Sequence, residues 1–239
     1  MQKIKFVIPN LFTLANIILG FFAIISAAAG LFERSVYCLF FAAFCDMLDG
    51  RLARWLNSSS KFGMELDSLS DMVSFGIAPA VLIYLASIKD LGVLGAVISA
   101  VYLSCGALRL ARFNVGGGPL SHVTFQGWPI PVGAGYIISF VMVRDGLPTW
   151  LIGLGTAFSA ACMISTIKVP KFRKGAGPPL VMLVIGMFMF VAFLWSPTAL
   201  TWHIWNTWNF IMVVANYYFL TKQGHIGKNA RPPEPQEAH

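Results

Sequence analysis

Charged residues are scarce in this sequence: they make up 11% of its 239 residues, whereas 57% are hydrophobic. Acidic residues are the rarest of these, with ten Asp and Glu against seventeen Lys and Arg. A mean hydropathy of +0.71 excludes a sizeable soluble domain and indicates a chain that crosses a membrane several times.

Cysteine and histidine are also few, with four of each. The four cysteines lie in hydrophobic runs without CxxC spacing, and the histidines are scattered, so we predict neither a disulfide framework nor a zinc site. The net charge of +7 is confined to the loops that flank hydrophobic runs. This placement favours an anionic lipid surface, and not nucleic acid, as the partner of the basic residues.

Long hydrophobic runs dominate the sequence, and most approach the length needed to span a bilayer. They lie near residues 8–31, 35–56, 64–87, 91–113, 130–145, 149–167, 178–196 and 203–220. They predict an all-α fold, a polytopic integral membrane helical bundle of about eight transmembrane helices, with 1–220 as one domain and 221–239 as a disordered tail. The run at 130–145 is the shortest and contains Pro131, Gly133 and Gly135, which favour a kinked or re-entrant segment.

Basic residues give an independent test of this topology. With the N-terminus in the cytoplasm, fourteen Lys and Arg fall on the cytoplasmic side, and only Arg34, Lys89 and Arg144 fall on the other. The positive-inside rule therefore predicts an even number of spans with both termini cytoplasmic. We expect a protein of the cell (inner) membrane.

Four aspartates interrupt the second and third runs: Asp46, Asp49, Asp67 and Asp71. Each charge costs roughly 2.5–3.5 kcal/mol inside a membrane, so four of them call for a cationic partner. Helical geometry places the first two on one face and the last two one turn apart on the next helix. If the helices are antiparallel neighbours, the four carboxylates converge, and oxygen ligands of this kind suit Mg²⁺, Mn²⁺ or Ca²⁺.

The full pattern is Asp-x2-Asp-Gly-x2-Ala-Arg-x8-Gly-x3-Asp-x3-Asp, from Asp46 to Asp71. It resembles the signature of the CDP-alcohol phosphotransferase family at every fixed position. The resemblance implies a homodimeric integral membrane enzyme that transfers a phosphatidyl or similar group from a CDP-linked donor to an alcohol, at a site facing the cytoplasm. The family shares a six-helix core, so the two C-terminal helices are a departure. The alternative is a buried acidic cluster without chemistry.

The resemblance also implies roles for the motif residues. Asp46, Asp49, Asp67 and Asp71 would hold two divalent cations, Mg²⁺ or Mn²⁺, and Asp71 would in addition be the catalytic base. Small side chains at Gly50, Ala53 and Gly63 let a ligand approach the backbone, and Arg54 offers a planar fork to a phosphate. With Asp49, these residues are the candidates for binding CDP-diacylglycerol.

A second stretch bears on the acceptor alcohol: Arg109, Arg112 and Asn114, followed by the turn Gly127-Trp-Pro129-Ile-Pro131. It resembles the branch of the family that uses L-serine, although Trp128 stands where that branch more often has Leu. The branch makes Arg109, Arg112 and Asn114 candidates for binding the serine carboxylate. The two arginines are otherwise explained as topological charge.

Three alternatives remain open. The acceptor could instead be glycerol phosphate, inositol phosphate or choline. The four aspartates could line a divalent-cation transporter, although such a path has no use for the Gly50, Ala53, Arg54 and Gly63 spacing. The basic loop at residues 168–174 is either topological charge or a site for phosphates or anionic lipid.

Overall fold

The computed structural model describes residues 2–115, 124–166 and 168–170, together with 191–192, 195–196 and 204. The chain divides into two units, residues 1–118 with 128–165 and residues 119–127 with 166–239. The predicted helices at 178–196 and 203–220 lie almost wholly outside the described residues, and the predicted tail at 221–239 lies entirely outside them.

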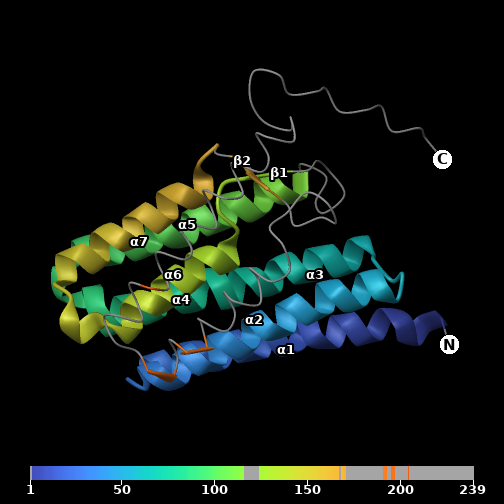
Figure 1. The fold of residues 1–239 in the computed structure, drawn as a ribbon, viewed down its shortest axis with the longest axis horizontal. Helices are drawn as coiled ribbons and strands as arrows, with labels where there is room; N and C mark the ends of the chain where they lie inside the picture. The colour runs from blue at the N-terminus through green and yellow to red at the C-terminus, as the bar shows by residue number, and fades with distance from the viewer. Residues whose placement is uncertain are drawn as a thin grey trace. The chain divides into compact units, whose positions relative to one another are not determined.

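The first unit is built entirely of helices in its described part (Figure 1). They are α1 (Gln2–Ala28), α2 (Phe32–Trp55), α3 (Lys61–Asp71), η1 (Met72–Ile77), α4 (Ala78–Ile83), η2 (Tyr84–Ile88), η3 (Lys89–Leu91), α5 (Val93–Val115), α6 (Ile130–Met142), η5 (Arg144–Gly146) and α7 (Thr149–Ile164). Each of the six hydrophobic runs within this unit is helical, so six of the eight predicted helices are confirmed.

Residues Lys61–Leu91 form one continuous helical segment. It changes from α to π geometry directly after Asp71, in η1, and again in η2. Wide turns of this kind occur mostly as short bulges and are frequent at functional sites. The Tyr102 hydroxyl of α5 donates a 2.9 Å hydrogen bond to the carbonyl oxygen of Phe75 in η1, so the wide turn is tied to its neighbour.

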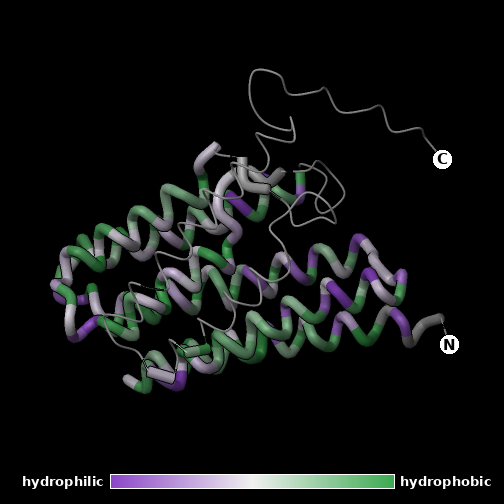
Figure 2. Tube along the Cα trace, in the orientation of Figure 1, coloured by the Kyte–Doolittle hydropathy of each residue, from purple (hydrophilic) through white to green (hydrophobic). Residues whose placement is uncertain are grey.

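Three of the described helices are long and apolar enough to cross a membrane: Val7–Ala28, Lys61–Leu91 and Val93–Val115. Hydrophobic colouring predominates along the helices in Figure 2, and hydrophilic residues gather at the end where α2 turns into α3. Large hydrophobic side chains such as Leu11 and Phe21 are 57% exposed, as expected where lipid replaces water. The chain is therefore a membrane protein.

Helix α1 packs against α2 and also against α3 and η1. Short turns, with positive φ at Gly30 and Asn57, reverse the chain at each end of α2, so α2 and α3 run antiparallel (Figure 1). Ser60 caps α3, because its hydroxyl accepts a 3.0 Å hydrogen bond from the Gly63 amide. Helices α2 and α3 are therefore the antiparallel neighbours on which the predicted convergence of the aspartates depends.

Small residues bring α1 close to the segment that begins with α3. The hydroxyls of Ser70 and Ser74 donate to the carbonyl oxygens of Thr13 and Asn16, at 3.0 and 2.9 Å. A Cβ atom on Gly20 would lie 2.9 Å from the Cα of Ser74, closer than real contacts allow. Close backbone approach through small and hydroxyl-bearing residues is the usual way in which helices associate in membranes.

Helix α6 begins directly after Pro129, and Pro131 lies in its first turn. A proline there starts a helix without removing a hydrogen bond, so it begins α6 and does not kink it. The Trp128 amide donates to the carbonyl of Cys162 at 3.0 Å, and its ring makes edge contacts with Tyr136 and Phe158. Trp128 thus packs between α6 and the end of α7.

The described part of the second unit contains a pair of antiparallel strands, β1 (Thr124–Gln126) and β2 (Lys168–Pro170). Thr124 pairs with Pro170 and Gln126 with Lys168. The sequence predicted helices only, because three residues are too few to show the alternation of a strand.

Candidate active site

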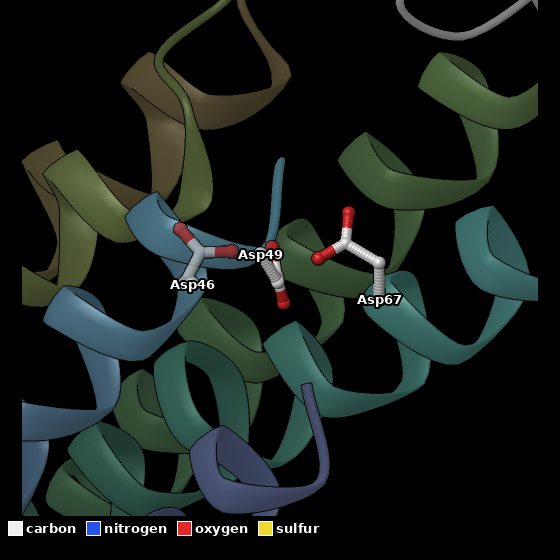
Figure 3. A group of neighbouring side chains, drawn as sticks. All are labelled: Asp46, Asp49 and Asp67. Carbon is white, nitrogen blue, oxygen red and sulfur yellow. The ribbon is translucent and has the colours of Figure 1, made fainter. Parts of the chain in front are cut away.

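Three carboxylates converge where α2 faces α3. Asp46 and Asp49 from α2 and Asp67 from α3 each present one oxygen atom, and these atoms lie within 4.8 Å of one another (Figure 3). Asp49 is only 5% exposed. The convergence expected from the Asp-x2-Asp spacing and an antiparallel partner helix is present in the structure.

Asp71 follows Asp67 by one turn and is 8% exposed. Its charge interacts with those of Asp46 and Asp67, so it belongs to the same cluster. Among the described residues, neither Oδ1 of Asp67 nor Oδ1 of Asp71 has a hydrogen-bond partner. Buried carboxylate oxygens without donors are costly unless a cation meets them, and a set of oxygen ligands fits a hard divalent ion.

Two guanidinium groups lie near the cluster. Arg109 of α5 is 7% exposed and interacts with the charges of Asp46, Asp67 and Asp71. It also lies over the Phe113 ring, 5.5 Å from the ring centroid. Arg54 interacts with the charge of Asp49. Two positive charges against four carboxylates leave an excess of negative charge, which a divalent cation would offset.

The small residues of the motif lie beside these acids. A Cβ on Gly50 would meet Nη1 of Arg54 at 3.7 Å, so the exposed guanidinium of Arg54 folds back along α2. A Cβ on Gly63 would lie 3.2 Å from Oγ of Ser60 and 3.5 Å from Oδ1 of Asn10. Gly50, Ala53 and Gly63 are all partly exposed, which leaves backbone accessible next to the carboxylates.

Helix α1 contributes a residue that the sequence reasoning missed. The Thr13 hydroxyl donates a 2.7 Å hydrogen bond to Oδ2 of Asp49 and lies 3.2 Å from the carbonyl oxygen of Pro9. Thr13 is 3% exposed. The signal that could have found it is the recurrence of Asn10, Thr13 and Asn16 at three-residue intervals in an otherwise hydrophobic run, which places polar groups on one face of α1.

The other two candidates for binding serine make contacts within the protein. Nη1 of Arg112 donates to the carbonyl oxygens of Ile164 and Ser165, at 3.2 and 3.5 Å, and so caps the end of α7. The Asn114 amide nitrogen donates to Ser68 at 3.0 Å and to Glu65 at 3.3 Å. Of the three, Arg109 is the one that the structure brings to the carboxylate cluster.

Comparison with known proteins agrees with the family resemblance of the aspartate motif. The family model for CDP-alcohol phosphatidyltransferase matches residues 6–168. A CDP-diacylglycerol–serine O-phosphatidyltransferase of Helicobacter pylori is 34% identical over 175 residues, which cover 71% of this chain and 74% of that protein. One of the same name from Bacillus subtilis is 36% identical over 169 residues, covering 71% and 93%. An archaetidylserine synthase of Methanothermobacter thermautotrophicus is 36% identical over 176 residues, covering 69% and 70%.

Proposed function

Because the chain belongs to the CDP-alcohol phosphatidyltransferase family, we propose that it transfers the phosphatidyl group of CDP-diacylglycerol to the hydroxyl of L-serine. The products are phosphatidylserine and CMP. The observation that carries this proposal is the convergence of Asp46, Asp49 and Asp67 where α2 faces α3. The choice of serine is supported by the names of the two bacterial relatives, which are 34% and 36% identical to this chain over 175 and 169 aligned residues.

In this reaction, the serine hydroxyl oxygen attacks the phosphorus that carries diacylglycerol, and the bond from that phosphorus to the CMP oxygen breaks. Asp71 accepts the proton of the attacking hydroxyl, a role that its burial and its interaction with Asp46 and Asp67 support. Two divalent cations, Mg²⁺ or Mn²⁺, when held by Asp46, Asp49, Asp67 and Asp71, would supply the positive charge that the diphosphate and the leaving CMP require.

The donor's CDP group would lie along the small residues of α2 and α3. Gly50, Ala53 and Gly63 leave space for it, and Asp49 lies beside them. Arg54 presents several donors in one plane and is suited to a phosphate oxygen pair. The acyl chains would remain in the surrounding lipid.

The acceptor would bind on the α5 side of the cluster. Arg109 is the principal candidate for the serine carboxylate, since its buried guanidinium interacts with the charges of Asp46, Asp67 and Asp71. Arg112 and Asn114 complete the proposed pocket, as residues that hold the end of α5 against α7 and α3.

We also propose the topology on which this function depends. The chain would span the inner membrane eight times within a single domain of residues 1–220, with both termini in the cytoplasm and the active site facing it, and would act as a homodimer. The support for the orientation is the distribution of basic residues, and the support for the dimer is the family resemblance.

The test is to incubate detergent-purified protein with CDP-diacylglycerol and, in turn, serine, glycerol 3-phosphate, inositol phosphate or choline. We expect CMP release with serine only, together with a lipid product that contains serine. Asp46→Asn serves as the inactive control. Release of CMP with a different alcohol alone would contradict the acceptor, whereas no release with any alcohol would contradict the transferase proposal itself.

A further inference from the structure

Thr13 lies at a point where three helices of the active site meet. Its side chain, on α1, reaches Asp49 on α2 through the 2.7 Å hydrogen bond from Oγ1 to Oδ2. Its backbone carbonyl accepts the 3.0 Å hydrogen bond from Ser70, the residue directly before Asp71 on α3. One residue of α1 is therefore bonded to both of the helices that carry the acids.

The contact with Asp49 constrains the direction of a carboxylate. A hydroxyl that donates to Oδ2 fixes the rotation of the carboxylate plane, and one oxygen of this carboxylate lies within 4.8 Å of those of Asp46 and Asp67. It also stabilises the charged form of the group, because a donor at 2.7 Å compensates for the loss of water around a side chain that is 5% exposed. Partners of this kind determine how well a carboxylate is oriented toward a cation.

The contact between Thr13 and Ser70 constrains the distance between α1 and α3. The Ser70 and Ser74 hydroxyls bond to successive turns of α1, and Gly20 lets the two backbones approach. Asp67 and Asp71 lie on the segment that these bonds hold. The separation between the acids of α2 and those of α3 is thus set by the way in which each helix is joined to α1.

From these two contacts we propose that Thr13 is a positioning residue of the cation site: it orients Asp49 and fixes α3 at the distance at which Asp67 completes the cluster. This inference rests on the proposed function, in which the carboxylates bind divalent cations. Thr13 itself touches neither substrate nor cation: its side chain acts through Asp49, and its backbone carbonyl acts through Ser70.

A purely structural role is the competing explanation. A buried threonine can satisfy its hydroxyl within its own helix, and Thr13 Oγ1 does lie 3.2 Å from the carbonyl of Pro9, four residues earlier. Thr156 in α7 provides the matched control, because it is fully buried and, within the part of the chain that the structure describes, donates only to the carbonyl of Ile152, four residues earlier, at 2.9 Å. Thr156→Val removes the same atoms as Thr13→Val without affecting an acid.

The experiment measures Mn²⁺ binding to the detergent-purified full-length protein, without substrates, by electron paramagnetic resonance titration. Thr13→Val keeps the volume of the side chain and removes the hydroxyl, so we expect Mn²⁺ to bind about 10–100-fold more weakly. Thr13→Ser and Thr156→Val should bind Mn²⁺ as the wild type does. If Thr13→Val does not purify as a folded protein, Thr13→Ala takes its place in the same titration.

A double-mutant cycle separates orientation from general stability. If Thr13 acts through Asp49, then adding Thr13→Val to Asp49→Asn should weaken Mn²⁺ binding no further. Additive losses, an unchanged affinity in Thr13→Val, or a loss of equal size in Thr156→Val would each overturn the inference. A wild-type protein that binds no Mn²⁺ would overturn the proposed cation site as well, whereas normal binding by both wild type and Thr13→Val would remove only the role of Thr13.

Discussion

Ser68 and Asn114 hydrogen-bond to each other across 46 positions of the sequence: Oγ of Ser68 lies 3.2 Å from Oδ1 and 3.0 Å from Nδ2 of the Asn114 amide. Ser68 directly follows Asp67, so the end of α5 is fastened to the turn of α3 that carries two of the acids. Arg109 lies five residues before Asn114 on α5 and is thereby held beside the carboxylates. The proposed serine pocket lies at this junction.

Arg109→Lys tests that pocket. Lysine keeps the positive charge and loses the planar fork that binds a carboxylate through two donors, so the apparent KM for serine should rise more than that for CDP-diacylglycerol. Arg112→Lys is the matched comparison and should give a smaller rise, because a lysine can still donate to the carbonyls at the end of α7. Steady-state CMP release with each substrate varied in turn gives both values. A change confined to CDP-diacylglycerol would place the serine pocket elsewhere.

Removal of divalent cations should abolish activity. EDTA treatment leaves the acidic cluster and the diphosphate with like charges facing each other, and addition of Mg²⁺ or Mn²⁺ should restore CMP release. The control is the same protein dialysed against buffer with the cation present. Undiminished turnover in rigorously metal-free buffer is incompatible with the proposed mechanism.

Asp46→Asn and Asp71→Asn should have different effects on cation binding and turnover. Asp46 lies within the group of converging oxygens, so its substitution should weaken cation binding and turnover together. Asp71→Asn removes the proposed base and should lower kcat about 10²–10⁴-fold, with donor and cation binding closer to wild type. The measurements are CMP release and equilibrium binding of CDP-diacylglycerol. Equal loss of donor binding in the two variants would make Asp71 a ligand and not the base.

The membrane topology can be tested with single cysteines in a protein whose four native cysteines have been replaced. Lys61 and Lys89 are exposed at opposite ends of the segment Lys61–Leu91. A membrane-impermeant thiol reagent should label Lys61→Cys only from the cytoplasmic side and Lys89→Cys only from the other. Labelling of both from one side would refute the proposed orientation of this span.

Gly20→Ala should destabilise the protein. The new Cβ would lie 2.9 Å from the Cα of Ser74, so α1 or η1 must shift, at a cost of about 1–3 kcal/mol. Gly135→Ala in α6 is the control, because its Cβ would meet no atom within 4 Å and alanine favours a helix. Thermal unfolding in detergent should show a lower Tm for Gly20→Ala only. Equal Tm values for Gly20→Ala and the wild type would mean that α1 and η1 do not approach each other closely at Gly20.

The sequence was sufficient to predict the six helices of the first unit and the meeting of Asp46, Asp49 and Asp67. Both predictions depend on strong, local signals: long hydrophobic runs set the helices, and a charge within such a run is too costly to remain without a partner. The motif's fixed spacing then placed the acids on facing surfaces. Three of the described helices are long and apolar enough to cross a membrane, and the prediction of eight spans stays untested.

Contacts between residues far apart in the sequence could not be predicted from local sequence signals. The spacing of Asn10, Thr13 and Asn16 marks a polar face of α1, but no local feature of the sequence shows that this face meets Asp49. The position of Arg112 at the end of α7 depends on how α5 and α7 pack, which the sequence of neither helix specifies. The π turn after Asp71 also depends on packing, since no residue type marks it.

The bond between Thr13 and Asp49 also has a consequence for biogenesis. Thr13 is synthesised 36 residues before Asp49 and 57 residues before Ser70, so α1 is made before either of its partners. Until then, the polar face of α1 must be shielded by water, lipid headgroups or the insertion machinery. A nascent chain arrested before Ser70 has been made would therefore contain α1 and α2 without the hydrogen bonds that join α1 to the segment beginning with α3.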